Sequence, residues 1–272
     1  MIAVATCALC GSVRWRTRES IDRFRVVQCE CGLVFVTPQP DTAALIGAYD
    51  DTYYEGWREQ SGARSRLWER RLRVVAAATS GRGRLLDLGC ATGDFLVAAR
   101  DAGWQVQGTE FSPAGARAAA ARGLDVTAGE VWDAALPTAS FDAITAWHVL
   151  EHARDPRRVL EECRRLLRPG GTLILAVPNV DERFFRLAYR LARGRPERLF
   201  DPGDREVHLF HFSARTLAAL VESAGFAVRR VGFDHGAAIV GPKLWVNRVA
   251  AAWFRLSGVN WGLGLELVAE RS

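Results

Sequence analysis

With 272 residues, of which 49% are apolar and 25% charged, the chain is long enough for one sizeable globular α/β domain with a small appendage. The net charge of +5 comes from scattered arginines, with Lys243 the only lysine; a nucleic-acid binder clusters its basic residues in stripes, so nucleic acid is not an expected partner. The first residues lack the regions of a signal peptide, and no apolar run nears the ~20 residues of a membrane-spanning helix, which predicts a cytoplasmic protein without a membrane span.

Four cysteines lie near the N-terminus in two close pairs, a pattern that indicates a metal site before disulfides in a cytoplasmic chain. Four thiolates can close a tetrahedral structural zinc site, and zinc would stabilise a unit at residues 1–38 that is too small to bury much core. The second pair is one residue shorter than a usual C-x-x-C knuckle, so an empty or three-ligand remnant is the alternative. The predicted zinc ligands are Cys7, Cys10, Cys29 and Cys31.

Residues 39–79 are predicted to form a helical lid segment between this knuckle and the main domain. It follows the proline turn at 37–40, and Asp41 is placed to cap its first helix. A later helix is indicated by Leu67, Trp68 and Leu72, whose spacing of three to four residues is typical of a helix with one buried face.

From Gly83 onward, strands and helices alternate, which indicates a doubly wound α/β domain at residues 80–272. Helices are expected after Thr92, Ser112, Asp155 and Ser213. The alternation is interrupted at residues 179–211 and again at 236–261. The expected strands are Arg84–Leu88, Trp104–Glu110, Leu124–Ala128, Phe141–Trp147, Thr172–Val177, Phe226–Gly232 and Leu263–Val268.

The turn after the first of these strands predicts a nucleoside site. Its glycines, Gly89 and Gly93, are spaced G-x-x-x-G rather than in the G-x-G-x-x-G pattern of dinucleotide sites. Asp87 at the strand end would repel a pyrophosphate but attract a cationic amino acid. Glu110, at the end of the second strand, can accept both hydroxyls of a ribose. These features favour S-adenosylmethionine, which carries an ammonium and a sulfonium but no phosphate.

The segment from Asp87 to Gly93, together with Glu110, the Phe141-Asp142 strand opening and the turn at 167–171, resembles class I S-adenosylmethionine-dependent methyltransferases. The resemblance implies a seven-stranded, mostly parallel sheet of order 3-2-1-4-5-7-6 with an antiparallel last strand. Ala91 stands where the family usually has its middle glycine, and a methyl group is tolerated there if φ is negative. The implied cofactor-binding residues are Asp87, Gly89, Cys90 and Gly93 at the methionine part, Glu110, Phe111 and Ser112 at the ribose and its flanks, Glu130 and Val131 at the adenine edge, and Trp147 beside the cofactor.

The N-terminal knuckle, the proline turn and the Tyr53-Tyr54-Glu55 segment resemble the front of a bacterial methyltransferase group associated with sugars, surface glycans and secondary metabolites. That resemblance implies a zinc-ribbon-like unit and a Tyr54 that packs over the cofactor. The group includes zinc-bearing sugar C-methyltransferases, which are longer and carry a further C-terminal domain.

A hydroxyl acceptor must lose its proton, and histidine is the natural base at neutral pH. Four of the five histidines fall where the acceptor is expected. His148 is either a base or a packing residue, and His152 is a base or, with Glu151, braces the loop. His208 and His211 either close the acceptor pocket or anchor the 179–211 insertion. The pattern His148-x-x-Glu151-His152 also resembles the metal-binding E-x-x-E-H of quinone O-methyltransferases, with histidine in place of the first glutamate. The candidate catalytic residues are His148, His152, His208 and His211.

Two segments are left with open roles. Residues 179–211 are predicted to cap the acceptor, and their arginines either meet a phosphate or carboxylate or form a solvated basic face. The Trp245–Leu256 helix, with Val249 and Trp253 on the same face, either caps the site or makes a homodimer contact.

The sequence predicts a methyltransferase that acts on a hydroxyl of a small molecule, namely a sugar, glycan precursor or secondary metabolite. Ribosomal or transfer RNA methylation is one alternative, because zinc knuckles precede some RNA methyltransferases. The knuckle lacks the interleaved basic and stacking aromatic residues of an RNA-binding surface. Sugar C-methylation would also fit these motifs, as would a non-catalytic scaffold that only binds the cofactor.

Overall fold

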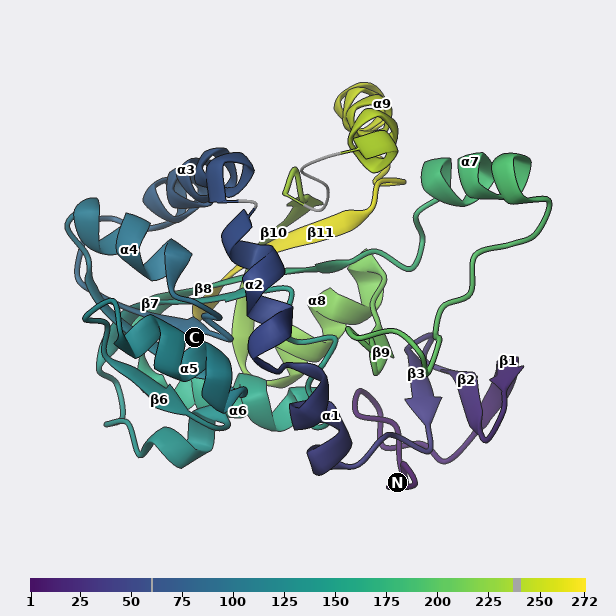
Figure 1. Ribbon diagram of the computed structural model, residues 1–272, viewed down its shortest axis with the longest axis horizontal. Helices are drawn as coiled ribbons and strands as arrows, with labels where there is room; N and C mark the ends of the chain where they lie inside the picture. The colour runs from purple at the N-terminus through teal and green to yellow at the C-terminus, as the bar shows by residue number, and fades with distance from the viewer. Residues whose placement is uncertain (60, 237–240) are drawn as a thin grey trace.

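A seven-stranded sheet forms the centre of the computed structural model, which describes residues 1–59, 61–236 and 241–272 (Figure 1). The strand order is β10-β11-β8-β7-β4-β5-β6, and β11 runs antiparallel to both of its neighbours. Numbered along the domain, this is the order 3-2-1-4-5-7-6, so the predicted sheet is confirmed. The strands are β4 (Arg84–Leu88), β5 (Gln105–Glu110), β6 (Val126–Ala128), β7 (Phe141–Trp147), β8 (Leu167–Pro178), β10 (Phe226–Phe233) and β11 (Gly264–Arg271).

Helices cover both faces of this sheet. Neighbouring residues of a strand point to opposite sides, and because the strands are apolar on both sides, each face must be covered. Leu85 of β4 packs in the core beneath α3 (Ser61–Ala78), α4 (Asp94–Asp101) and α5 (Pro113–Ala120). Leu86 packs in the opposite core, beneath α6 (Pro156–Leu166) and α8 (Ala214–Ser223). Helix α6 ends at Leu166, and the expected turn at 167–171 lies inside β8.

The N-terminal unit forms a second, antiparallel sheet of β1 (Trp15–Ile21), β2 (Phe24–Cys29), β3 (Val34–Thr37) and β9 (Phe210–His211). The last strand comes from the end of the 179–211 segment and pairs Phe210 with Phe35 and His211 with Val34. The cysteine-bearing unit is therefore hydrogen-bonded to the strand that carries a candidate catalytic histidine.

The lid segment consists of α1 (Thr42–Ala48), α2 (Asp51–Glu59) and α3, with Asp41 accepting a hydrogen bond from the Ala44 N–H as a helix cap (3.0 Å). A short 3₁₀ helix, Val131–Ala134, follows β6. The two interrupting segments contain α7 (Phe184–Arg193) and α9 (Gly241–Ser257), and residues 237–240 of the predicted 236–261 segment lie outside the described residues. In the described part of the chain, no helix has the length and apolar character needed to cross a membrane.

Candidate active site

The glycine turn after β4 brings the backbone close to its neighbours. Gly89 adopts φ +60°, and a Cβ at this position would lie 2.6 Å from Cγ2 of Val149. Gly93 adopts φ +78°, and a Cβ there would collide with Leu124. Both positions therefore require glycine, for conformation and for space.

Ala91 does not meet the condition under which a methyl group is tolerated without strain, because its φ is +49°. A left-handed conformation costs an alanine roughly 1–2 kcal/mol. The Ala91 N–H donates to Oε2 of Glu110 (2.8 Å), so this backbone conformation serves to hold the carboxylate at the end of the neighbouring strand.

Glu110 is anchored on both sides. Besides the Ala91 N–H, the Ser112 N–H (2.8 Å) and the Tyr54 hydroxyl (3.2 Å) donate to its Oε1. Burial raises the pKa of Glu110, and the two backbone donors and the Tyr54 hydroxyl act in the opposite direction. One lone pair of Oε2 is left for a ligand hydroxyl once these three donors are counted.

Asp87 lies deeper, with 2% of its surface exposed, and accepts a hydrogen bond from Thr145 (2.6 Å). Burial raises the pKa of Asp87 to about 7, while Thr145 and the Arg71 guanidinium lower it. Arg71 is itself buried between the rings of Trp68 and Trp147, 5.0 and 4.5 Å from their centroids. A buried acid coupled to a buried guanidinium suits a ligand that carries both an ammonium and a carboxylate.

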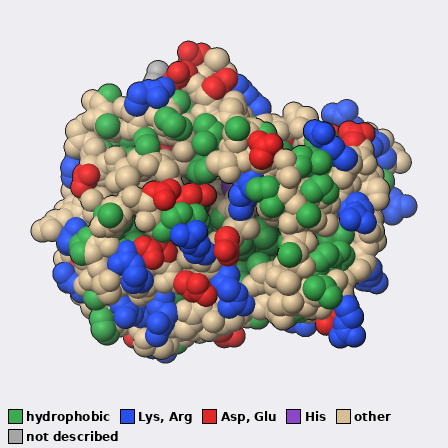
Figure 2. Space-filling view, turned by 90° about the horizontal axis from the view of Figure 1, so that it is seen from below, with side chains coloured by type: hydrophobic (Ala, Val, Ile, Leu, Met, Phe, Trp, Pro, Cys, Tyr) green, Lys and Arg blue, Asp and Glu red, His purple; other side chains and the backbone are tan. Residues whose placement is uncertain are grey.

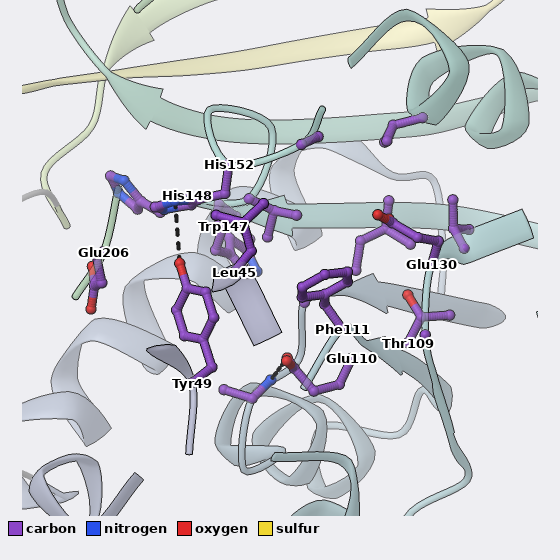
Figure 3. A pocket seen from close by; sticks show the side chains of 18 of the residues that line it. Leu45, Tyr49, Thr109, Glu110, Phe111, Glu130, Trp147, His148, His152 and Glu206 are labelled. Atoms are coloured by element: carbon purple, nitrogen blue, oxygen red, sulfur yellow. Dashed lines mark hydrogen bonds between the residues drawn. The ribbon is translucent and has the colours of Figure 1, made fainter. Parts of the chain in front are cut away.

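A cavity of about 180 Å³ lies over this turn, between the lid helices and the carboxyl ends of β4, β5 and β7 (Figure 3). Phe111 and Glu130 lie at one end, and His152 and Glu206 lie at the other. Of the predicted cofactor residues, the following line it: Tyr54, Gly89, Glu110, Phe111, Glu130, Val131 and Trp147.

The other four predicted cofactor residues do not line this cavity. Asp87, Cys90 and Gly93 form the buried side of the turn. Ser112 caps α5 and donates to the carbonyl of Tyr49 (2.6 Å), which ties the lid to β5. Sequence reasoning missed Tyr49, whose hydroxyl lies 3.3 Å from Nδ1 of His152 (Figure 3).

A second, larger cavity of about 530 Å³ adjoins the first and brings the four candidate histidines together. His148 and His152 line both cavities, together with Trp147, Glu206 and Val207. His208 and His211 line only the second. The His152 and His208 rings are 4.9 Å apart, and those of His208 and His211 are 6.2 Å apart.

His148 is held between two buried carboxylates. Its Nε2 donates to Oδ2 of Asp234 (2.9 Å), and its Nδ1 lies 3.4 Å from Oε1 of Glu151. Burial alone would lower the pKa of His148, but the two carboxylates outweigh it and raise that pKa to about 9. At neutral pH this side chain is therefore an imidazolium, whose Nε2 donates to Asp234 while its Nδ1 side forms an ion pair with Glu151. Asp234 had no sequence signal, because it lies 86 residues beyond His148.

This pairing predicts a pH-dependent stability. His148 has its ordinary pKa in the unfolded chain and a pKa of about 9 when folded, so its contribution is complete below pH ~6.5 and is lost as the pH rises through ~9. We expect the free energy of unfolding to fall by up to about 3 kcal/mol across this range. Urea unfolding at several pH values measures it, and His148→Gln should remove this part of the profile. Identical profiles for both proteins would contradict the pairing.

His152 differs in its proton arrangement. Its Nδ1 lies 2.9 Å from the carbonyl oxygen of Val207, which can only accept, so Nδ1 carries a proton and donates it to this oxygen. Burial lowers the pKa of His208 to about 4 and that of His211 to about 3, so both rings are neutral at pH 7.

Glu151 completes this cluster. Its carboxylate is buried, and neither of its oxygens has a hydrogen-bond partner among the described residues. One ligand atom each from Glu151, His152 and His208 lies within 4.8 Å of the others, a grouping that could hold a metal ion.

The four N-terminal cysteines converge despite the shortened second pair. Their sulfurs all lie within 4.8 Å of one another, with Cys7–Cys31 at 3.6 Å and Cys10–Cys29 at 3.5 Å. Tetrahedral zinc with Zn–S bonds of about 2.3 Å needs sulfurs about 3.8 Å apart, so these residues fit a closed zinc site.

Two arginines attach this knuckle to the main domain. Arg157 of α6 donates to the carbonyls of Ala8 and Leu9 (3.0 and 2.8 Å), and Arg215 of α8 donates to the carbonyl of Cys31 (2.8 Å). Both cysteine turns are therefore held against the helices of the large domain.

The doubly wound sheet, the glycine turn and the acids at two neighbouring strand ends define the class of S-adenosylmethionine-dependent methyltransferases. Residues 59–231, more than half of the chain, match the family described as a methyltransferase domain. The chain belongs to this family.

Relatives agree with this assignment. The chain is 31% identical over 183 residues to a probable S-adenosylmethionine-dependent methyltransferase of Mycolicibacterium smegmatis, covering 65% of this chain and 66% of the relative. It is 37% identical over 126 residues to the ubiquinone biosynthesis O-methyltransferase of Xanthomonas oryzae pv. oryzae, and this match covers 43% of this chain and 53% of the relative. The chain thus spans about half to two thirds of these relatives' lengths.

A solved structure shows the same fold. A SAM-dependent methyltransferase from Thermotoga maritima superposes with a TM-score of 0.56 at 21% identity. The alignment covers 82% of this chain and 98% of that one. At this level of identity the likeness concerns the fold alone.

Proposed function

We propose that the protein transfers a methyl group from S-adenosylmethionine to a hydroxyl of a small acceptor, namely a sugar, glycan precursor or secondary metabolite. The observation that carries this proposal is the pair of adjoining cavities. The first is built from the glycine turn and Glu110, and the second is lined by four histidines, of which His148 and His152 lie on the wall of both.

The residues of the first cavity fit the cofactor. Bound S-adenosylmethionine would supply the electrophilic methyl group. Glu110 would accept from one ribose hydroxyl through the remaining lone pair of Oε2. The amino-acid end would extend toward Arg71, which lines the adjoining second cavity, with Asp87 buried behind the glycine turn. Tyr54, whose hydroxyl donates to Glu110, would close this end of the site. Bound in this way, the cofactor would present its methyl group to the second cavity. This placement matters because methyl transfer depends chiefly on alignment of the reacting atoms.

The second cavity suits a polar acceptor. Its lining carries both signs of charge, and the 179–211 segment supplies much of it, including Arg186, Glu197 and Asp204, which supports the role of that segment as an acceptor cap. We assign the base to His152, since Val207 holds its Nδ1 proton and Nε2 is the nitrogen left for proton transfer, whereas both nitrogens of His148 face carboxylates. The O-methyltransferase named among the relatives supports a hydroxyl acceptor.

Basic and acidic side chains are interspersed on the face in Figure 2, which favours a small molecule over RNA. Mass spectrometry of ligand released from the purified protein tests the cofactor, with S-adenosylmethionine or S-adenosylhomocysteine expected. Transfer of labelled methyl to sugars, nucleotide sugars, phenols and RNA then tests the acceptor. Transfer to RNA alone, or to carbon alone, would contradict the hydroxyl proposal.

Replacing the strand-end acids should weaken cofactor binding. Glu110→Ala removes one charge-assisted hydrogen bond of about 1.5–3 kcal/mol to the ribose, so we expect about a 100-fold loss of affinity for S-adenosylhomocysteine. Asp87→Asn should lower the affinity for S-adenosylhomocysteine about tenfold. Calorimetric titration measures both, and Asp125→Asn, at an exposed acid bonded to Gln107, is the control. Unchanged affinity in both variants would refute the site.

A further inference from the structure

Helices α7 and α9 pack against each other at the same side of the molecule, at the upper right and top of Figure 1. Phe184 of α7 packs against Ala250, Ala251 and Phe254 of α9. The inner surfaces of this pair are therefore covered, but no residue of α7 is fully buried, and the outer surface of α9 faces solvent.

That outer surface is strongly apolar. On α9, Trp245, Val249, Trp253 and Leu256 follow one another at spacings of four, four and three residues, which places them on one helix face. Their exposed fractions are 67%, 57%, 37% and 87%. On α7, Leu187 and Leu191 are also exposed. Six of the ten exposed large apolar side chains in the described residues thus lie on these two helices. This outer apolar surface is called the α7/α9 face below.

The same helices are basic. They contain six Arg or Lys residues and no acid, whereas the whole chain has 36 basic and 31 acidic residues. The rest of the chain therefore has 30 basic against 31 acidic residues, so the net positive charge of the protein resides in α7 and α9. The six are Arg186, Arg190, Arg193, Lys243, Arg248 and Arg255.

We propose that the α7/α9 face docks on an anionic lipid surface. Tryptophan and leucine on one face of a helix, flanked by arginine and lysine without acids, combine the apolar burial and the charge attraction that hold an amphipathic helix at a lipid interface. The flanking cations lie beside the apolar rings: Arg248 lies 5.0 Å from the ring centre of Trp245. Docking of a second copy through this face would bring Arg248 and Arg255 of one α9 against those of the other, with no acid on either helix to pair with them, which opposes a symmetric dimer.

Docking would also bring the acceptor cavity to the lipid surface. Phe185 and Arg186 of α7 and Lys243 of α9 line that cavity. The docking proposal does not depend on methyl transfer, because lipid binding is measured without cofactor or acceptor.

Flotation with lipid vesicles tests the proposal. The purified chain should float with vesicles of phosphatidylcholine containing about 30% phosphatidylglycerol and remain behind with phosphatidylcholine alone, and ~0.5 M salt should weaken the binding. Two double variants should each bind the anionic vesicles at least about tenfold more weakly than the wild type. They are Trp245→Ser with Leu256→Ser, and Arg248→Glu with Arg255→Glu.

The matched control places the same kinds of change on the knuckle, Val13→Ser with Arg25→Glu, at two exposed positions outside the α7/α9 face. It should bind like the wild type, and all variants should keep the wild-type melting temperature because the altered side chains are exposed. Equal binding to neutral and anionic vesicles, no binding to either, or undiminished binding by both test variants would overturn the proposal. So would a dimer, seen by light scattering, that dissociates in the Trp245→Ser, Leu256→Ser variant.

Discussion

The His152→Gln variant is expected to lose about 10²- to 10⁴-fold in kcat, the usual contribution of a positioned general base. Glutamine can still donate to the carbonyl of Val207, as Nδ1 of the imidazole does, but it offers no basic nitrogen. Because the proton transfer belongs to the chemical step, the affinity for S-adenosylhomocysteine should stay within about threefold. Steady-state kinetics with the identified acceptor and calorimetric titration give the two quantities.

His235→Gln is the control, since its ring lies outside both cavities and kcat should be unchanged. His148→Gln should change the free energy of unfolding and its pH dependence more than it changes kcat. An unchanged kcat in His152→Gln would place the base elsewhere. A transfer reaction that stops on chelation while the cysteine site keeps its zinc, and that returns with an added divalent ion, would instead assign Glu151, His152 and His208 to a metal.

If the four cysteines hold zinc, as we propose, removing this zinc should abolish methyl transfer while leaving cofactor binding in place. The purified protein should contain one zinc per chain, and Cys29→Ser should contain none. Strand β3 of the knuckle pairs with β9, so disorder in the knuckle would displace His208 and His211 from the second cavity. The first cavity depends mainly on the lid, on β4, β5 and β7 and on the loops that follow them, and it should still bind S-adenosylhomocysteine.

The melting temperature of Cys29→Ser should fall by about 10 °C or more, because a structural zinc contributes several kcal/mol and 1 kcal/mol shifts a domain of this size by about 2–4 °C. Elemental analysis and thermal unfolding measure these effects. Cys163→Ala removes a buried thiol of α6 that lies outside the cluster, and this control should keep its zinc. A protein that lacks zinc and yet melts and turns over normally would show that the cysteines form an empty remnant.

Much of the fold could be predicted because its signals are local. The observed bounds of β4 and β7 match the expected strands, since continuous apolar runs between turns mark buried parallel strands. Asp41 and Ser213 cap the helices expected of them, since a cap needs only residues three or four positions away. The class of cofactor likewise followed from one turn and two strand-end acids.

The site chemistry depends on residues far apart in the chain. Nothing near His148 shows that Asp234 will hold its proton, and nothing near His152 shows that Tyr49, 103 residues earlier, lies beside it. Protonation states follow from burial and from neighbouring charges, which exist only once the chain has folded.

By itself, the sequence determined the sheet order through the family resemblance, the cofactor turn, the cysteine cluster and the apolar stripe of α9. Only the tertiary structure decided that Ala91 has a positive φ, that the knuckle shares a sheet with His211, and that the α9 stripe faces solvent rather than the acceptor. Periodicity identifies one face of a helix, but which side of that helix is covered depends on packing against segments distant in the chain.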